Sequence, residues 1–425
     1  MKRNIGNLFI IACVLLTVAV WFVFPPENDG RANFERAYAG EIIGSINIVL
    51  MASALFLSTR PKWAEPYFGG LDKMYVTHRR VATTAFLLIF VHVLTVPISP
   101  QWALGNYLAV IAFTGIVSIV LISLAPRIAF LNKLTGGTYE GWKNLKKYIG
   151  IFFIIGFIHS LTIGDPLHAL EAITFVQIFF IIGTVSYLYT EVFGRFFKKY
   201  VPYSVEAVKH PNASTTEVTL RAKKDSIPKH RAGQFLFVRF PNARTLNESH
   251  PFTISSAPHE DVLRVTVKAS GDFTRALFTE LQPGTDAVVE GAYGLFDYKT
   301  GGQKQIWIAG GIGLTPFLSF VRTMDGDTNH DIDLYYTVRH KEEALFVDEL
   351  EAGAKRNPRL KVHIRYSATD GSLSIDDIVK AAGGSIINHH IYMCGPLPMV
   401  QAFEKKFLAL GTSANQIHYE EFNFR

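Results

Sequence analysis

Three histidines in the first half of the chain have types and spacing that suit metal chemistry. His78 and His92 bracket the apolar stretch HRRVATTAFLLIFVH, and His159 ends the stretch WKNLKKYIGIFFIIGFIH. The interval of 14 residues between His78 and His92 corresponds to about 21 Å and nearly four turns of α-helix. The two imidazoles therefore share one helix face at different depths. Ionisable side chains within apolar helices are costly and usually functional, so these histidines are candidate metal ligands.

The depth of His159 decides which histidine it can pair with. His92 and His159 both fall near the outer ends of their stretches, and two imidazoles at one depth can hold a b-type haem by both axial positions. A partner for His78 would stand 13 or 14 residues before His159, where the chain has Lys146 and Leu145. Three possibilities stay open: one haem at His92 and His159, a second haem held by His78 and an unusual ligand such as Lys146, or inner ligation by another residue.

Six apolar runs are available to position these histidines in a bilayer, whose core needs about 20 helical residues. The runs are Leu8–Phe24, Ile42–Thr59, Val81–Ser99, Tyr107–Ala125, Ile149–Ile163 and Ala172–Thr190. Of the lysines and arginines in and around them, 15 lie in alternate loops and 2 in the opposite loops. The positive-inside rule predicts an inner (plasma) membrane protein with both termini and the second half of the chain in the cytoplasm.

The composition limits the other classes of function. The chain has 425 residues, of which 49% are hydrophobic and 18% charged, and its net charge is +6. Membrane topology accounts for the basic residues, so no nucleic-acid partner is expected. The apolar start is interpreted as a retained helix, because the triplet Ala37-Tyr38-Ala39 lies too far beyond it for a signal cleavage site. Cys13 and Cys394 lie in different halves, so no disulfide is expected.

The pattern changes near residue 200, which predicts a multidomain protein. We expect a six-helix transmembrane bundle over residues 1–200. Short alternating runs such as TTEVTLRAKK, GQFLFVRF and LRVTVKAS predict a small antiparallel β-barrel over 201–300. Strand-like and helix-like segments then alternate over 301–425, which predicts an α/β domain with a parallel sheet. Ligands of such a sheet bind at the carboxyl ends of its strands.

Four motifs of the second half lie where this architecture can use them. HPFTISS (His250–Ser256) ends a strand of the barrel, and KASGDFTRAL places Gly271 and Thr274 before a helix start, where backbone N–H groups suit a pyrophosphate. AGGIGLTP (Ala309–Pro316) follows the strand IWIA, and its glycines let the backbone approach a dinucleotide phosphate. MCGPLPM (Met393–Met399) follows the last strand of the sheet.

The ordered set HPFTIS, GxxT, GAYG, GGIGLTP and CGP resembles the ferredoxin–NADP reductase superfamily. The first half resembles the ferric reductase and NADPH oxidase family in His78-Arg79, His92, Trp142, Tyr148 and His159, and departs from two-haem members at Lys146. The joint resemblance covers nearly the whole chain. It implies a flavohaem membrane reductase with FAD, haem b and NADPH as cofactors.

The resemblance also implies roles for single residues. His250, Pro251, Phe252 and Thr253 would bind FAD, with His250 near the phosphates, Phe252 on the isoalloxazine and the Thr253 hydroxyl near N5. Gly271 and Thr274 would hold the pyrophosphate. Gly310, Gly311, Gly313 and Thr315 would face the nicotinamide nucleotide, with Cys394 and Gly395 near the nicotinamide. A C-terminal aromatic residue, Phe424 or Phe422, would cover the flavin.

The nucleotide and the electron acceptor are further expectations. Arg339, His340 and Lys341 follow the second strand of the nucleotide domain, where cations favour a 2′-phosphate and hence NADPH, although Glu342 and Glu343 oppose this. The expected activity is transfer of electrons from cytoplasmic NADPH to an acceptor at the outer face. Ferric complexes are the first candidate, and dioxygen, a quinone or a periplasmic redox partner are alternatives. A haem-binding subunit without turnover is the remaining class.

Overall fold

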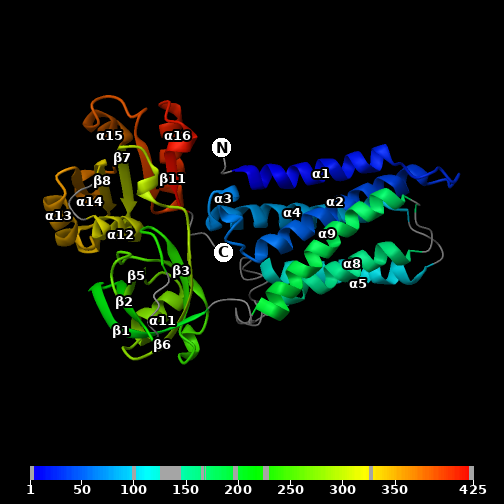
Figure 1. The fold of residues 1–425 in the computed structure, drawn as a ribbon, viewed down its shortest axis with the longest axis horizontal. Helices are drawn as coiled ribbons and strands as arrows, with labels where there is room; N and C mark the ends of the chain where they lie inside the picture. Colours follow the sequence, from blue (N-terminus) through cyan, green and yellow to red (C-terminus); the bar gives the residue numbers. More distant parts are fainter. Residues whose placement is uncertain are drawn as a thin grey trace. The chain divides into compact units, whose positions relative to one another are not determined.

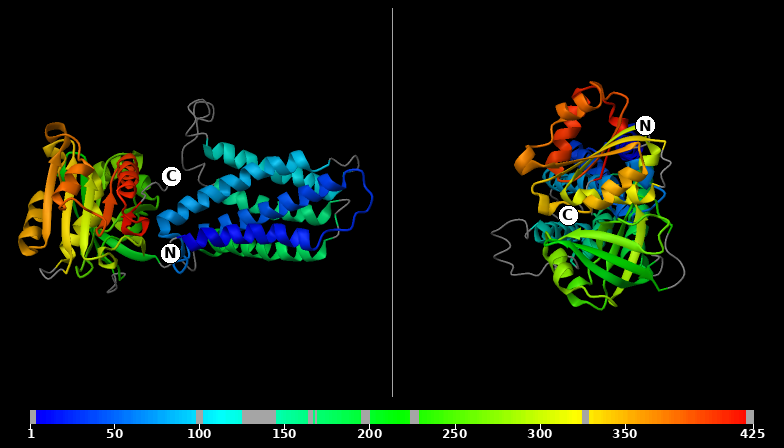
Figure 2. Two further views of the ribbon diagram at one scale, coloured as in Figure 1. Left: turned by 90° about the horizontal axis from the view of Figure 1, so that it is seen from above. Right: turned by 90° about the vertical axis from the view of Figure 1, so that its left-hand side faces the viewer.

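The structure is a computed structural model that describes residues 4–97, 102–124, 145–163, 167, 169–194, 200–223, 229–324 and 329–420. Phe422, Phe424 and His168 lie outside the described residues, as does the side chain of Lys146. The chain forms two compact units. One consists mainly of Lys198–Arg425, and the other of Lys2–Gly69 with Lys73–Phe197. The second unit is helical and the first contains the sheets (Figures 1 and 2).

The helical unit contains a helix at each of the six predicted apolar runs. These are α1 (Ile5–Val23), α2 (Phe34–Ser58), α4 (Leu71–Thr95), α5 (Leu104–Leu124), α8 (Ile149–Thr162) and α9 (Leu170–Leu188). A short helix, α3 (Glu65–Phe68), precedes α4, a 3₁₀ turn, η3 (Lys146–Tyr148), leads into α8, and a π-helical turn, η4 (Tyr189–Phe193), extends α9.

Four of the described helices are long and apolar enough to cross a membrane: α1, α2, α5, and α9 with its extension η4. The two helices that carry the candidate ligands differ. α8 is apolar but has only 14 residues, and α4 has 25 residues with charged side chains concentrated in its first three turns. The described part of the chain therefore has four candidate spans, and the predicted count of six depends on α4 and α8.

Apolar side chains cover the outside of the helical unit. On α1, Leu8, Phe9, Leu15 and Phe22 are each exposed by more than 60%. Apolar surface of this extent is rare on proteins surrounded by water. It is the surface expected where a helix contacts lipid.

The first sheet has six antiparallel strands in the order β4-β3-β6-β1-β2-β5. They are β1 (Val201–Asn212), β2 (Thr215–Ala222), β3 (Phe235–Arg239), β4 (His250–Thr253), β5 (Leu263–Lys268) and β6 (Asp286–Tyr293). An isolated bridge between Ile254 and Val265 joins the end of edge strand β4 to edge strand β5. The sheet therefore curls toward the predicted antiparallel barrel, and α11 (Asp272–Glu280) packs on it through Phe273 and Leu277.

The second sheet has five parallel strands in the order β11-β10-β7-β8-β9. They are β7 (Lys304–Gly310), β8 (Asp331–Val338), β9 (Leu360–Tyr366), β10 (His390–Cys394) and β11 (Ile417–Tyr419). The strand order reverses between β7 and β10. Ligands of open parallel sheets bind at the carboxyl ends of the strands at this reversal, where AGGIGLTP and MCGP stand.

Helices cover both faces of the parallel sheet (Figure 1). α12 (Thr315–Thr323) and α13 (Val347–Arg356) pack on one face around Trp307 and Tyr336, with the short α14 (Ser367–Asp370) at the end of β9. α15 (Ile375–Ala381) and α16 (Leu397–Ala409) pack on the other face around Ile308 and Ile391. This arrangement confirms the predicted α/β domain.

Candidate functional site

His92 on α4 and His159 on α8 come together in the helical unit. Their ring centroids are 6.4 Å apart and their planes are inclined by 74°. His92 Nδ1 donates to the carbonyl of Gly40 at 3.0 Å, and His159 Nδ1 donates to the carbonyl of Gly105 at 3.0 Å. A neutral imidazole that donates through Nδ1 keeps Nε2 as the atom available to a metal. Both rings are thus held in the tautomer of an Nε2 ligand.

The separation of the two rings fits an iron atom between them. Metal–imidazole bonds of about 2 Å on either side, plus the distance from each nitrogen to its ring centre, give centroids roughly 6 Å apart. Metal-bound imidazoles also usually donate their second N–H to an oxygen, as both do here. The described residues contain no group of three or more His, Cys, Asp or Glu side chains poised around a metal ion. A haem needs only two axial ligands from the protein, which His92 and His159 would supply.

His78 lies further toward the N-terminal end of α4 and is held in the same way. Its Nδ1 donates to the carbonyl of Ala54 on α2 at 2.9 Å. The first 200 residues contain four histidines: His78, His92, His159 and His168. Since His92 faces His159, His168 is the one other histidine in this part of the sequence, and it follows α8 by six residues.

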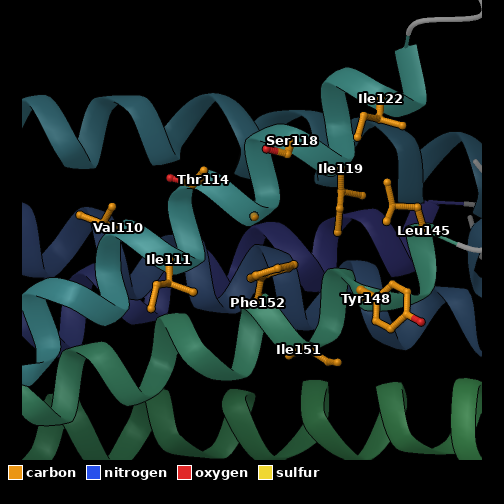
Figure 3. A pocket seen from close by; sticks show the side chains of 11 residues that line it. Val110, Ile111, Thr114, Ser118, Ile119, Ile122, Leu145, Tyr148, Ile151 and Phe152 are labelled. Carbon is orange, nitrogen blue, oxygen red and sulfur yellow. The ribbon is translucent and has the colours of Figure 1, made fainter. Parts of the chain in front are cut away.

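An apolar cavity of about 630 Å³ lies between α5 and α8 (Figure 3). Tyr148 and Phe152 from α8 and its preceding turn contribute to the walls. Phe152 precedes His159 by 7 residues, close to two turns of α8, so these two residues share one face. The part of this face nearer the start of α8 is therefore apolar.

The strand HPFT brings the expected flavin residues together on β4. β4 pairs with β3, with Thr253 opposite Phe235 and His250 opposite Val238. The His250 ring stacks on Phe273 of α11, with centroids 3.8 Å apart, and its Nε2 contacts Glu248 Oε2 at 3.1 Å. Phe252 is only partly buried, which leaves part of its ring for a planar ligand.

Thr274 shapes the turn at the start of α11. Its hydroxyl accepts from the backbone N–H groups of Ser270 and Gly271 at 2.9 and 2.8 Å, and donates to the carbonyl of Gly271 at 3.0 Å. The N–H groups of the first helical turn have no partner within the helix. The turn therefore presents these N–H groups to an anion, and Thr274 fixes the backbone that carries them.

The two glycine motifs of the nucleotide domain touch each other at the reversal of the strand order. AGGIGLTP continues from β7 as a 3₁₀ turn, η7 (Gly311–Leu314), into α12, and Pro316 occupies the first turn of that helix. Gly311 has φ +55°, and a Cβ atom on Gly313 would overlap the carbonyl group of Cys394. The position of Gly311 favours glycine because of its positive φ, and that of Gly313 needs glycine because the close approach to the end of β10 leaves no room for a side chain.

Cys394 ends β10 and is fully buried. Burial raises the pKa of its thiol well above the ordinary value, and the Glu420 carboxylate raises this pKa further. The thiol is therefore neutral at physiological pH. Glu420 is itself buried, and its Oε1 lies 3.0 Å from the place that a Cβ of Gly294 would occupy. Glu420 was not predicted from the sequence, because in the terminal stretch EEFNFR only the aromatic residues suggested a role.

Arg339, His340 and Lys341 are all exposed just beyond β8. Of the two acidic residues that follow, Glu343 forms an ion pair with Lys268 at 3.8 Å. This ion pair neutralises the charge of Glu343, one of the two carboxylates that would repel a phosphate there. The cationic end of β8 is thus open to a ligand.

Comparison with known families identifies both sheets. Residues 201–307 match the family described as FAD-binding domain, and residues 307–405 match the family described as Oxidoreductase NAD-binding domain. The matched segments coincide with the antiparallel sheet and with most of the parallel sheet.

Curated relatives match the same half of the chain. The ferredoxin reductase component of 3-ketosteroid-9-alpha-monooxygenase from Rhodococcus rhodochrous is 25% identical over 225 residues, which are 52% of this chain and 64% of the relative. The carnitine monooxygenase reductase subunit of Escherichia coli is 27% identical over 179 residues, 41% of this chain and 53% of the relative. A Chromobacterium violaceum flavohemoprotein is 25% identical over 46% of this chain and 54% of its own length. The chain thus spans between about half and two thirds of these relatives.

One solved structure has a related overall fold. Flavohemoglobin from Malassezia yamatoensis, solved with bound FAD and heme, aligns over 91% of this chain and 97% of its own with a TM-score of 0.53 and 16% identity. At this identity the likeness concerns the fold alone.

Residues 201–405 therefore form an oxidoreductase module of the ferredoxin reductase type, a FAD-binding domain followed by an NAD-binding domain. Modules of this kind transfer electrons from NAD(P)H through FAD. With the four apolar helices that precede it, the chain fits the architecture of the ferric reductase and NADPH oxidase family.

Proposed function

We propose that this chain is a membrane reductase that passes electrons from cytoplasmic NADPH, by way of FAD and one b-type haem, to ferric complexes at the outer face. The observation that carries the proposal is the pair of His92 and His159, whose rings stand 6.4 Å apart in the same chain as a FAD- and NAD-binding module. The four candidate spans and the excess of basic residues in alternate loops support an inner-membrane protein with its module in the cytoplasm.

The cofactors supply the redox chemistry: FAD exchanges a hydride for single electrons, and a haem with two histidine ligands carries single electrons. The chain contributes position. In the proposal, His250, Pro251, Phe252 and Thr253 hold the flavin, and the turn at Gly271 and Thr274 holds its pyrophosphate. Gly310, Gly311, Gly313, Thr315 and Gly395 admit the nucleotide, while Phe424 or Phe422 covers the flavin.

Cys394 contributes a neutral, buried side chain at the end of β10, where the nicotinamide is proposed to bind. Because its thiol is protonated at physiological pH, it adds no negative charge that would hold the positively charged oxidised nicotinamide in the site. Arg339 provides a cation for the 2′-phosphate of NADPH, in the position where such a phosphate is read in parallel nucleotide-binding sheets.

The short outer loops favour a small acceptor. The segments PISPQWALGN and GDPLHALE, which follow the third and fifth apolar runs, are too short to form a docking domain for a large protein. A ferric complex that diffuses to the haem edge matches them. Dioxygen and a quinone are equally small, and both are compared in the acceptor experiment.

Replacement of His92 or His159 by leucine tests the haem site. We expect each variant to lose haem binding, because one axial ligand is removed. Reduction of a soluble dye by NADPH should persist, since the nucleotide and flavin sites are intact. Haem is measured as the pyridine haemochrome on detergent-purified protein. Thr84→Leu is the matched control, since Thr84 lies on the same helix as His92, is exposed, and its hydroxyl donates to the carbonyl of Arg80 one turn earlier. A full haem spectrum in both histidine variants contradicts the assignment.

The acceptor is tested with the purified protein in liposomes. NADPH oxidation is followed with ferric citrate, with dioxygen alone and with a short-chain quinone, and the haem-deficient His92→Leu protein is the control. A rate with ferric citrate that depends on His92 and exceeds the other two supports the proposal. A His92-dependent rate that is highest with dioxygen, with superoxide formed, contradicts the ferric assignment and makes the protein an oxidase. Failure with all three acceptors, despite bound FAD and haem, favours a subunit without turnover.

A further inference from the structure

Helix α12 contacts both cofactor-binding parts of the soluble unit. It begins at Thr315, directly after the glycine turn of the nucleotide site. Phe296, which follows the last barrel strand, packs against α12, with ring centroids 5.7 Å from Phe317 and 5.6 Å from Phe320. The helix therefore joins the nucleotide turn to the FAD-binding domain through an apolar contact. A polar contact lies beside it.

Arg322 makes the polar contact. Its Nη1 donates to the carbonyl of Ser255 at 2.9 Å, and its Nη2 to Glu217 Oε1 at 3.2 Å, both in the FAD-binding domain. Its Nε and Nη2 also donate to the two carboxylate oxygens of Glu349 on α13, at 2.7 and 2.9 Å. One guanidinium thus connects the two domains.

The segment that Arg322 holds is the continuation of the flavin strand. Ser255 lies two residues after Thr253, and α12 also reaches the next residue, because Ser319 Oγ donates to the carbonyl of Ser256 at 2.7 Å. On its other side the segment is bound to β5, where the Ser255 N–H donates to the carbonyl of Arg264 at 2.8 Å. The position of Thr253 relative to the nucleotide turn is therefore determined by hydrogen bonds on both sides.

Burial makes this contact costly as well as specific. The side chain of Arg322 is 7% exposed and that of Glu217 is 8% exposed. Removing such charges from water costs several kcal/mol per ion, and well-packed apolar residues often stabilise a fold as much or more. What an apolar pair does not provide is the directional geometry of a guanidinium fork.

We propose that Arg322, assisted by Ser319, is a positioning residue that sets the distance between the flavin edge at Thr253 and the nicotinamide site at Gly313 and Cys394. The role rests on the proposed transfer from NADPH to FAD. That step moves a hydride from C4 of the nicotinamide to N5 of the flavin, so that one C–H bond breaks, one N–H bond forms, and NADP⁺ and reduced flavin result. Misplacement of reacting atoms by about 1 Å can slow a reaction by two orders of magnitude.

The test is anaerobic stopped-flow reduction of the flavin in the full-length protein. For Arg322→Met we expect the rate constant at saturating NADPH to fall roughly 10- to 100-fold. The primary isotope effect with C4-deuterated NADPH should rise, because hydride transfer becomes more fully rate-limiting. FAD content and the Kd of NADP⁺ should be unchanged. Arg322→Lys should recover part of the rate, since an ammonium group retains the charge but lacks the planar fork.

Arg365→Met is the matched control. Arg365 also holds one carboxylate and two backbone carbonyls, those of Asp377, Gly371 and Asp370, but all of them lie within the nucleotide domain. A similar slowing in Arg365→Met would overturn the proposal. So would a normal rate and isotope effect in Arg322→Met, even with a lowered Tm, because the role would then be structural.

Ser319→Ala provides a second test in case the Arg322→Met variant does not fold. It removes one hydrogen bond to the same segment, and we expect a smaller slowing, roughly threefold to tenfold, without loss of FAD. An unchanged rate in this variant overturns the proposal. If the unaltered protein binds FAD and NADPH but does not reduce the flavin, both the proposed function and the role of Arg322 fail. A failure of the Arg322 proposal alone would instead appear only in the variants, with normal flavin reduction in the unaltered protein.

Discussion

The protonation state of Cys394 is set by its surroundings. Cys394 is a neutral thiol because it is buried beside Glu420, and burial raises its pKa well above the ordinary value. Thiolates, and not thiols, act as nucleophiles. Cys394 therefore does not suit covalent catalysis.

Arg339 is the residue with which choice of nucleotide can be tested. Arg339→Asp should raise the KM for NADPH by roughly tenfold or more, because a bond between ions is lost and a repulsion replaces it. The KM for NADH should change much less, since NADH lacks the 2′-phosphate. Initial rates of dye reduction measure both values, with Arg356→Asp, a charge reversal at the exposed end of α13, as control. Equal increases for the two nucleotides would show that Arg339 does not bind the 2′-phosphate.

The role of Arg322 became visible only in three dimensions. Arg322 is the basic residue of the helix TPFLSFVRT, and in the sequence it resembles the favourable cation at the end of any helix. Its partners Glu217 and Glu349 precede and follow it by 105 and 27 residues, a pairing that no local pattern encodes. His92 and His159 were predictable because charge-bearing residues inside apolar runs are rare.

Turns, more than strands, form the candidate cofactor sites. The loop before α11 depends on Thr274, whose hydroxyl accepts from two backbone N–H groups. The sequence indicated an anion site there. The structure adds that the Thr274 hydroxyl forms its hydrogen bonds within the turn. It would therefore support a phosphate indirectly, by holding the backbone N–H groups in place.

Thr274→Val tests this turn. The substitution preserves the shape of the side chain but removes the cap, which costs about 1 kcal/mol. We expect the Tm to fall by about 2–4 °C and the ratio of FAD to protein to decrease. Flavin fluorescence on heating measures both. In Thr279→Val, the control on the same helix, a hydroxyl that bonds an exposed carbonyl one turn earlier is lost, so FAD should be retained. Equal FAD loss in the two variants would assign the effect to the helix in general.

Prediction of the elements succeeded best where a pattern is long. The apolar runs are long and continuous, the later strand-like and helix-like segments alternate regularly, and each coincides with an observed element. The boundaries were less predictable. α4 begins at Leu71, ten residues before the predicted run, because a helix whose first turns are polar continues through side chains that a hydrophobicity pattern excludes. The short strand β11 was missed, since three residues give no periodic pattern.

The number of haems is a property of the whole molecule. The structure gives His92 a partner histidine on α8, whereas the same face of α8, nearer its start, carries the apolar Phe152. We therefore expect about one haem per chain, by pyridine haemochrome against released flavin, and no loss of haem in His78→Leu. Two haems per chain, one of them lost in His78→Leu, would contradict this expectation and restore an inner site.

His78, His92 and His159 of the helical unit share one feature, a hydrogen bond from Nδ1 to a main-chain carbonyl, at Ala54, Gly40 and Gly105. A carbonyl belongs to every residue, so no single substitution on the neighbouring helices deletes the acceptor. The path of the backbone therefore sets the orientation of each imidazole. A side-chain carboxylate in the same place could be removed by a single substitution. In evolutionary terms, the helices around the ligands are free to exchange most of their side chains while the ligand geometry persists. The ligand position itself is then the sensitive point.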